Sequence, residues 1–218
     1  MKEAYFTPST IHRMGLSLLE EVRNLRDRHT NMVFDPNKAA LLVLDMQYYF
    51  MSKKSHAYLP SAYAIIPGIK NLIHVFKKRK RPVIFTRHIN QIDDARLMAL
   101  WWKDLISPSS SHSKVTSALD TRGCMTIIKN QYDAFFETNL ESYLRDEKVE
   151  QVCITGVMTH LCCETTTRSA FTRGFRVLFT VDGTATYNAA FHRASLLNLS
   201  HGFALPMLVN EIIEGFQL

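Results

Sequence analysis

Residues 150–174, EQVCITGVMTHLCCETTTRSAFTRG, are the most informative part of the sequence for the fold. The first eight residues, EQVCITGV, contain a largely apolar run from Val152 to Val157 without strict alternation, which is typical of a strand buried on both faces. The rest has the pattern of a helix and ends at Gly174, the kind of residue that commonly closes helices. A second apolar run, FRVLFTVDGTA, follows at 175–185. A strand, a helix and a strand in this order predict a unit of a parallel sheet.

The same alternation extends in both directions along the chain. Further strands are predicted in apolar runs at 38–45, 82–88 and 124–130, and FALPMLVNEII at 203–213 is predicted to be a last strand or a strand that leads into a helix. Helical patterns occupy the segments 9–29, 71–80, 93–106, 137–149 and 188–202. We therefore predict an α/β protein whose parallel sheet carries helices on both faces. A helical extension over residues 1–35 would precede a single domain over residues 36–218.

Composition and charge argue against several functional classes. The net charge is +6, but the basic cluster FKKRKRP at 76–82 lies at the predicted end of a helix, and no nucleic-acid motif accompanies it. No apolar run approaches the roughly 20 residues that a membrane helix needs. Four cysteines without secreted-type spacing indicate a reducing, cytoplasmic setting. The expected partner is a small-molecule substrate, with neither nucleic acid nor membrane.

Chemically reactive residues follow the predicted strands. Asp45 ends the first strand, Lys129 ends the third, Cys162 and Cys163 follow the fourth, and Asp182 ends the fifth. Ligands of such sheets bind outside the carboxyl ends of the strands, so these side chains are expected on one rim. A lysine stabilises a thiolate, a carboxylate accepts the thiol proton, and a helix N-terminus offers N–H groups to an oxyanion. Buried packing is the alternative for each cysteine.

At these positions the sequence resembles the isochorismatase-like cysteine hydrolases, which include nicotinamidases, N-carbamoylsarcosine amidases and isochorismatases. The resemblance covers roughly residues 36–210. It rests on ALLVLDMQYYF (40–50), IKNQYDAFFETNLESYL (128–144), ITGVMTHLCCETTTRSAFTRGFRV (154–177) and VDGTAT (181–186). It implies a three-layer αβα fold with a doubly wound, six-stranded parallel sheet, isochorismatase-like and thus Rossmann-like.

The resemblance also implies roles for individual residues. Asp45 corresponds to the catalytic acid and base, Lys129 to the lysine of the triad, and Cys162 to the nucleophile. Cys163 falls on the next helical position and is expected to pack inward. The family has a cis peptide bond before the residue that matches Met158. That bond would aim the backbone N–H groups of Met158 and Cys162 at one point, which forms the oxyanion hole.

Departures from the family pattern narrow the expected substrate. Metal-dependent nicotinamidases carry Asp-x-His after the second strand, whereas this chain reads TRHINQIDDAR at 86–96. We therefore predict neither a metal nor another cofactor, and nicotinamide is disfavoured. Isochorismatases commonly carry Gly, Gln and Tyr where this chain has Cys162, His88 and Met158. Asp133 also replaces a usual Ser, beside the triad lysine.

The leading prediction is a cysteine hydrolase that cleaves a small amide or ureido C–N bond through a thioester. The first alternative is an isochorismatase-type vinyl-ether hydrolase in which Asp45 acts as the acid. The second is a non-catalytic binding protein of the same fold, and a homodimer or higher homo-oligomer is expected in each case. The predicted substrate-binding residues are Gln47, His88, Trp101, Trp102, Tyr132 and Phe135.

Overall fold

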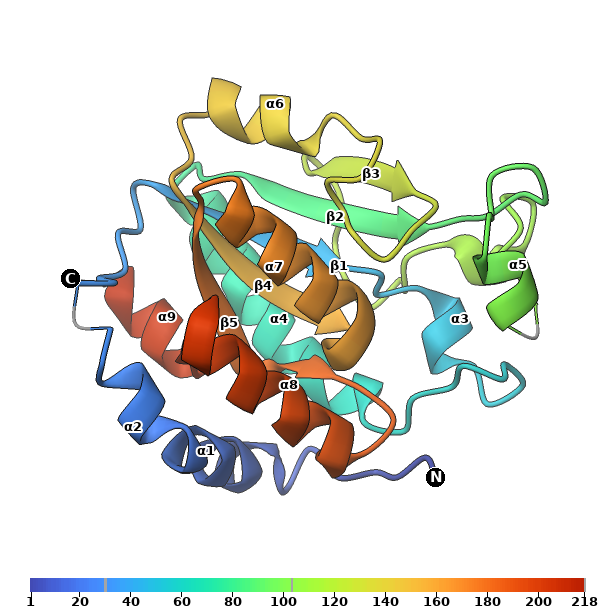
Figure 1. Ribbon diagram of the computed structural model, residues 1–218. Helices are drawn as coiled ribbons and strands as arrows, with labels where there is room; N and C mark the ends of the chain where they lie inside the picture. The colour runs from blue at the N-terminus through green and yellow to red at the C-terminus, as the bar shows by residue number, and fades with distance from the viewer. Residues whose placement is uncertain (30, 103, 218) are drawn as a thin grey trace.

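The computed structural model describes residues 1–29, 31–102 and 104–217, and it has three layers (Figure 1). The central layer is a six-stranded parallel sheet with the strand order β3-β2-β1-β4-β5-β6. The strands are β1 (Ala39–Leu44), β2 (Val83–His88), β3 (Met125–Lys129), β4 (Gln151–Val157), β5 (Arg176–Ala185) and β6 (Leu205–Met207). The predicted doubly wound αβα fold is confirmed. The strand order reverses between β1 and β4, which is where open α/β sheets bind their ligands.

Helices cover both faces of this sheet. In Figure 1, α7 and α8 lie in front of the sheet and α4 lies behind it. The helices are α1 (Ile11–Glu21), α2 (Arg23–Arg26), α3 (Tyr48–Met51), α4 (Ala62–Lys78), α5 (Met98–Trp101), α6 (Leu140–Asp146), α7 (Glu164–Thr172), α8 (Ala189–Gly202) and α9 (Val209–Gly215). The 3₁₀ turn η1 (Ser111–Ser113) and the π turn η2 (Thr159–Cys163) complete the regular elements. Among the described residues, no helix has the length and apolar character needed to cross a membrane.

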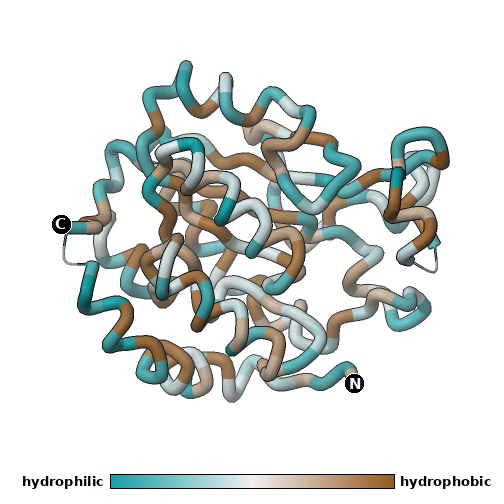
Figure 2. The backbone as a smooth tube through the Cα atoms, in the orientation of Figure 1, coloured by the Kyte–Doolittle hydropathy of each residue, from teal (hydrophilic) through white to brown (hydrophobic). Residues whose placement is uncertain are grey.

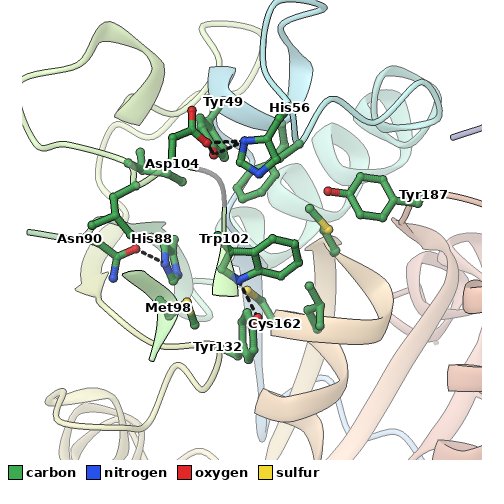
Figure 3. A pocket seen from close by; sticks show the side chains of 16 residues that line it. Tyr49, His56, His88, Asn90, Met98, Trp102, Asp104, Tyr132, Cys162 and Tyr187 are labelled. Carbon is green, nitrogen blue, oxygen red and sulfur yellow. Dashed lines mark hydrogen bonds and ion pairs between the residues drawn. The ribbon is translucent and has the colours of Figure 1, made fainter. Parts of the chain in front are cut away.

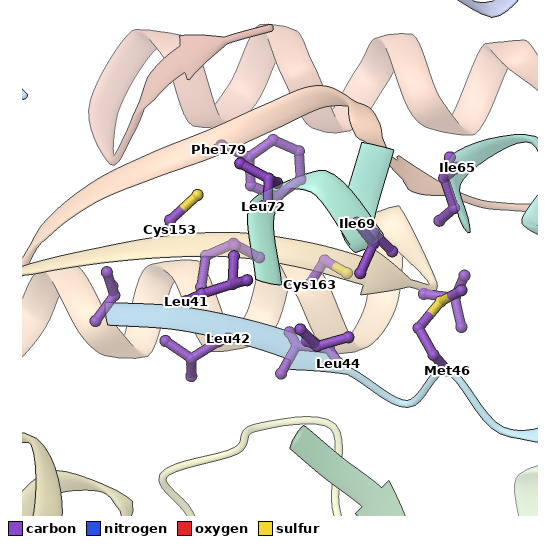
Figure 4. Packing of buried hydrophobic residues seen from close by; sticks show 14 of the residues in the cluster. Leu41, Leu42, Leu44, Met46, Ile65, Ile69, Leu72, Cys153, Cys163 and Phe179 are labelled. Carbon is purple, nitrogen blue, oxygen red and sulfur yellow. The ribbon is translucent and has the colours of Figure 1, made fainter. Parts of the chain in front are cut away.

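The hydrophobic core is built around β1 and β4. Every residue of these two strands is buried, as their unalternated apolar runs predict. Hydrophobic segments gather in the middle of the molecule and hydrophilic ones lie towards its outside (Figure 2). Ile69 and Leu72 of α4 pack against this sheet with Leu41 and Phe179 (Figure 4). Full burial of such a side chain contributes roughly 1.5–3 kcal/mol to folding.

Several element boundaries differ from the sequence prediction; for example, the helix predicted at 93–106 is reduced to α5, Met98–Trp101, among the described residues. Helix α4 begins at Ala62, before Pro67, although the predicted helix begins after that proline. Pro67 removes one helical hydrogen bond, but the burial of the first turns of α4 against the sheet outweighs this cost. Strand β5 runs past Asp182 to Ala185. Asp182 is therefore not at the strand end, and its carboxylate accepts a hydrogen bond from the Val209 N–H at the start of α9 (2.8 Å).

The N-terminal segment packs against the sheet and beside the turn after β5. The backbone N–H of Glu3 donates to the Tyr187 carbonyl (2.8 Å), and the Tyr5 hydroxyl accepts from the Thr186 N–H (2.9 Å). In α1, a Cβ atom on Gly15 would lie 3.0 Å from the Cβ of Asp182. This close approach allows α1 to cover β5.

Gly156 is required where β4 pairs with β1. Its φ is 106°, and a Cβ atom there would lie 2.1 Å from the Leu44 carbonyl oxygen. We expect Gly156→Ala to lower the free energy of unfolding by roughly 3 kcal/mol or more, because both strain and a backbone clash must be relieved. Urea denaturation measures this effect. Gly202→Ala is the matched control, since its Cβ would meet nothing within 4 Å, and equal stability of the two variants would contradict the prediction.

Candidate active site

The acid, the lysine and the thiol predicted from three strand ends lie together in the structure. Asp45 follows β1, Lys129 ends β3, and Cys162 lies in η2 after β4. The Lys129 Nζ is 2.8 Å from the Asp45 Oδ2 and 3.4 Å from the Cys162 Sγ. All three side chains are buried. One ammonium therefore contacts both the carboxylate and the thiol at the switch point of the sheet.

Local structure fixes the Asp45 carboxylate. Asp45 has a positive φ of 50°, an uncommon conformation that aspartate tolerates better than most residues and that ends β1. Thr86 of β2 accepts a hydrogen bond from the Asp45 N–H (3.0 Å) and donates its hydroxyl to Oδ1 (2.6 Å). Lys129 contacts the other oxygen. The side chain is thereby oriented from both sides, and Thr86 is a supporting residue that the sequence interpretation missed.

The three groups differ in their preferred proton state. Burial raises the pKa of the Cys162 thiol to about 12, although the Lys129 ammonium opposes this shift. Burial also acts to raise the pKa of Asp45, but the charge of the Lys129 ammonium and the hydrogen bonds from Cys162 and Lys129 outweigh it and leave that pKa below its ordinary value. Burial acts to lower the pKa of Lys129, but Asp45 and Cys162 together raise it. The resting site is thus a carboxylate, an ammonium and a neutral thiol.

His88 lies at the edge of this group as a neutral imidazole. Burial and the Lys129 ammonium lower the pKa of His88 to about 4. Its Nδ1 lies 3.3 Å from the Lys129 Nζ, and its Nε2 lies 2.6 Å from the Asn90 Oδ1. Because an ammonium only donates, the hydrogen-bond network assigns the proton to Nε2. The Lys129 Nζ also donates to the Gln131 carbonyl (3.0 Å), so the ammonium has four partners: Asp45, Cys162, His88 and Gln131.

The turn after β4 separates the two adjacent cysteines. The peptide bond between Val157 and Met158 is cis, as the resemblance implies. The N–H of Cys163 then donates to the Met158 carbonyl (3.1 Å). Cys162 and Met158 line the cavity, whereas Cys163 is fully buried and packs in the hydrophobic core (Figure 4). The sequence prediction that Cys163 packs inward is confirmed.

A small, mostly apolar cavity opens beside Cys162 (Figure 3). Its volume is about 50 Å³. A water molecule needs roughly 10–15 Å³ on this measure, so the space suits roughly four waters or a small planar molecule. The lining residues are Tyr49, Phe50, His56, Ala57, His88, Asn90, Met98, Trp102, Asp104, Leu105, Ile106, Tyr132, Met158, Leu161, Cys162 and Tyr187.

Of the six predicted substrate-binding residues, His88, Trp102 and Tyr132 line this cavity. The Trp102 Nε1–H donates to the Tyr132 hydroxyl (2.8 Å), so two of these aromatic side chains form one wall. Thr86, Tyr49, His56 and Asp104 are site residues that sequence reasoning missed.

The other three predicted substrate-binding residues lie outside the cavity. Trp101 is 79% exposed, because adjacent residues at the end of α5 point in different directions. Phe135 is buried and stacks on Phe175. The Gln47 amide bonds to the backbone N–H and carbonyl of His88 (2.8 and 3.0 Å), so Gln47 positions His88 and does not form part of the wall.

The Asp133 carboxylate forms its hydrogen bonds with residues other than Lys129. It accepts hydrogen bonds from the Ser169 hydroxyl (2.6 Å) and from the Phe135 N–H (2.8 Å). The carboxylate that replaces the usual Ser side chain is therefore bonded to α7 and to the backbone of Phe135, and it does not pair with Lys129.

Asp45, His88 and Cys162 also carry atoms that bind metals. Within the described part of the chain, these ligand atoms all lie within 4.8 Å of one another. However, the Lys129 Nζ contacts each of the three residues, at 2.8, 3.3 and 3.4 Å. This ammonium supplies the positive charge that a metal ion would bring and would repel a second cation. The arrangement favours metal-free chemistry.

Comparisons with known proteins identify the family of this chain. The family model described as the isochorismatase domain matches residues 39–211. Nicotinamidase 3 from Arabidopsis thaliana is 39% identical over 179 residues, which cover 78% of this chain and 85% of that protein. Enterobactin synthase component B from Escherichia coli (strain K12) is 30% identical over 208 residues, covering 94% of this chain and 73% of that protein. A solved cysteine hydrolase from Pseudomonas syringae pv. phaseolicola 1448A has a TM-score of 0.79 and 25% identity, covering 84% of this chain and 94% of that chain.

Proposed function

Because the chain belongs to the isochorismatase family of hydrolases, we propose that it cleaves a small amide or ureido C–N bond through Asp45, Lys129 and Cys162. The observation that carries this proposal is the position of the Lys129 ammonium, in contact with both the carboxylate and the thiol. A lysine placed there stabilises a thiolate as it forms and keeps the carboxylate in its basic form. These are the requirements of a nucleophile and its general base.

In the first half of the reaction, the thiol proton moves from the Cys162 Sγ to Asp45 while the sulfur attacks the substrate carbonyl carbon. The raised pKa of Cys162 and the lowered pKa of Asp45 oppose this transfer in the empty site. Transfer is therefore coupled to attack, when the negative charge passes from the sulfur to the carbonyl oxygen. The backbone N–H groups of Met158 and Cys162 are the proposed donors to that oxyanion.

In the second half, the tetrahedral intermediate collapses and breaks the C–N bond. Asp45 returns its proton to the departing nitrogen, which leaves as ammonia or an amine and leaves a thioester on Cys162. Asp45, again a carboxylate, then takes a proton from a water molecule that attacks the thioester carbonyl. Release of the carboxylic acid returns the proton to the Cys162 sulfur and restores the site.

Size and polarity of the cavity indicate the substrate class. The space suits a small molecule, and its walls are largely aromatic and aliphatic. The carboxylate of Asp104 faces this space and disfavours an anionic substrate. A flat, neutral carboxamide fits these features. The absence of Asp-x-His disfavours nicotinamide, but the similarity to a protein named Nicotinamidase 3 makes nicotinamide the first carboxamide to test.

A vinyl-ether hydrolase of the isochorismatase type is the second candidate. It is favoured by the isochorismatase domain model, which matches residues 39–211 of this chain. In this reaction Asp45 would protonate the substrate carbon and Cys162 would take no part. Pyruvate release from isochorismate that survives Cys162→Ser would favour this candidate over the first.

A substrate screen tests the lead proposal. We expect ammonia release from at least one of nicotinamide, pyrazinamide, benzamide and N-carbamoylsarcosine, each assayed beside isochorismate with pyruvate as the readout. Turnover of isochorismate without turnover of any amide would overturn the amidase proposal.

A further inference from the structure

Tyr5 connects the N-terminal segment to the turn that carries the proposed nucleophile. Its hydroxyl accepts a hydrogen bond from the Thr186 N–H (2.9 Å) and lies 2.9 Å from the Nδ1 of His192 in α8. The same Nδ1 lies 3.3 Å from the hydroxyl of Thr159, the first residue of η2. Thr159, Thr186 and His192 are all fully buried. A chain of polar contacts therefore runs from Tyr5 through α8 to η2.

This chain of contacts does not depend on an assumed position of a proton. Burial lowers the pKa of His192 to about 3, so its imidazole is neutral in the neutral pH range. Because the hydroxyls of Tyr5 and Thr159 both donate and accept, either neutral tautomer can bond through Nδ1. A buried polar group without a partner is costly, so the three groups hold one another in place.

The turn η2 determines the positions of several reacting groups. It begins directly after Met158 and contains Cys162. Both residues line the cavity, and their backbone N–H groups are the proposed donors to the oxyanion. The Cys162 Sγ also lies 3.4 Å from the Lys129 ammonium. A shift of η2 would therefore displace the nucleophile and the oxyanion donors at the same time.

The N-terminal segment has further contacts around the same turn. The Glu3 carboxylate accepts a hydrogen bond from the Ala189 N–H (3.0 Å), and Figure 1 shows the first residues of the chain beside this end of α8. The Glu3 N–H donates to the carbonyl of Tyr187, which lines the cavity. The Nδ1 of His160 in η2 bonds to the Thr186 hydroxyl. The segment is thus anchored on both sides of Tyr5's contact with His192.

We propose that Tyr5 is a positioning residue for the proposed reaction, and that its hydroxyl, acting through His192, holds the Thr159 end of η2. The match to the family domain begins at residue 39, so this support comes from a part of the chain outside the matched domain. The proposal rests on the proposed amidase function only for its catalytic readout, because the opening of η2 is measurable without any substrate.

Hydrogen exchange of Tyr5→Phe tests the proposal without a substrate. The variant keeps the ring, which packs against Phe6 and His192, and removes only the hydroxyl. The N–H groups of Leu161 and Cys163 both donate to the Met158 carbonyl (3.1 Å each), so their exchange reports the opening of η2. We expect both to exchange roughly three- to ten-fold faster in Tyr5→Phe, as the loss of one hydrogen bond allows.

Tyr48→Phe is the matched control for this measurement. The exposed Tyr48 hydroxyl also has two hydrogen bonds, since it accepts from the Ser117 N–H (2.9 Å) and donates to the Ser117 hydroxyl (2.7 Å). Its loss should leave the exchange of η2 within about two-fold of the parent. Thr159→Val breaks the proposed chain of contacts at its other end and should speed the same exchange as Tyr5→Phe does.

Steady-state kinetics give the catalytic readout. In Tyr5→Phe, kcat should fall roughly ten-fold while KM stays within about two-fold, because the loss concerns the reacting groups and not the aromatic wall. In the double variant with Thr159→Val, the two losses should not multiply, since both changes break one chain of contacts. Multiplying losses would indicate two independent effects and would contradict the proposed connection.

Each result decides the role of Tyr5. Parent-like exchange of η2 in Tyr5→Phe, or the same increase in Tyr48→Phe, would overturn the proposal. Faster exchange with an unchanged kcat would also overturn it, because Tyr5 would then stabilise the turn without positioning the reacting groups. The amidase proposal fails separately, when the parent protein releases no ammonia from any amide, and the exchange measurement still tests the hold on η2 in that case.

Discussion

Replacing Cys162 with alanine is expected to lower kcat/KM for the best amide substrate by roughly a thousand-fold or more. The variant removes the atom that forms the covalent bond, and a water molecule in its place is a far weaker nucleophile. Cys162 is almost completely buried, but it lines the cavity and contacts the Lys129 ammonium at 3.4 Å. Steady-state ammonia release from the parent and the variant measures the effect.

The neighbouring cysteine provides the matched control. Cys163 has the same chemistry and nearly the same position in the sequence, but its side chain packs in the core. Cys163→Ala should therefore keep kcat/KM within about ten-fold and lose roughly 1–2 kcal/mol of stability through the small cavity that it creates. A large loss of activity in Cys163→Ala with normal activity in Cys162→Ala would reverse the assignment of the nucleophile.

Replacing Lys129 with methionine is expected to cause the second large effect, on stability as well as on activity. Asp45 and Lys129 form an ion pair whose side chains are both 0% exposed. Removal of one partner leaves a buried carboxylate without compensation, which typically costs 3–5 kcal/mol. Chemical denaturation at neutral pH measures the loss, and activity should fall to the level of Cys162→Ala. Parent-like stability of Lys129→Met would contradict the ion pair.

A paired variant and the pH dependence test the cause of this loss. The double variant Asp45→Asn with Lys129→Met removes both charges and should recover part of the stability that Lys129→Met loses. In the parent, the folded structure lowers the pKa of Asp45, so the ionised carboxylate stabilises the folded state. This stabilisation is complete above the unfolded-state pKa of about 3.9, and it is lost as the pH falls through the lower folded-state pKa. In Lys129→Met, burial without the ammonium raises the pKa of Asp45. The penalty should therefore be smaller at pH 5 than at pH 8, because the carboxyl group takes up a proton.

The convergence of Asp45, Lys129 and Cys162 could be predicted because the rules of parallel sheets fix it. The carboxyl ends of β1, β3 and β4 must lie at one edge whatever the lengths of the intervening loops. The buried runs that mark β1 and β4 are equally visible in the sequence, since only a strand covered on both faces lacks alternation. These features depend on local pattern and topology alone.

The cavity wall could not be predicted in the same way, because it depends on the direction of individual side chains in irregular segments. Trp101 and Trp102 are neighbours, yet only the second lines the cavity. Gln47 follows Asp45 after the end of β1, but its side-chain amide bonds to the backbone of His88. His56 and Asp104 are 48 positions apart in the sequence, lie in loops without a motif, and meet only in the folded chain.

Mass spectrometry of the acid-quenched reaction tests the central claim most directly, because the account requires a covalent thioester on one sulfur. After rapid mixing of the parent protein with a turned-over amide, the intact mass should rise by the acyl group, and peptide mapping should place that group on Cys162. The Cys162→Ala protein should carry no acyl group, and Cys163→Ala should carry it as the parent does. Full turnover with no acyl group on Cys162 at any quench time, together with normal turnover by Cys162→Ala, would contradict the account.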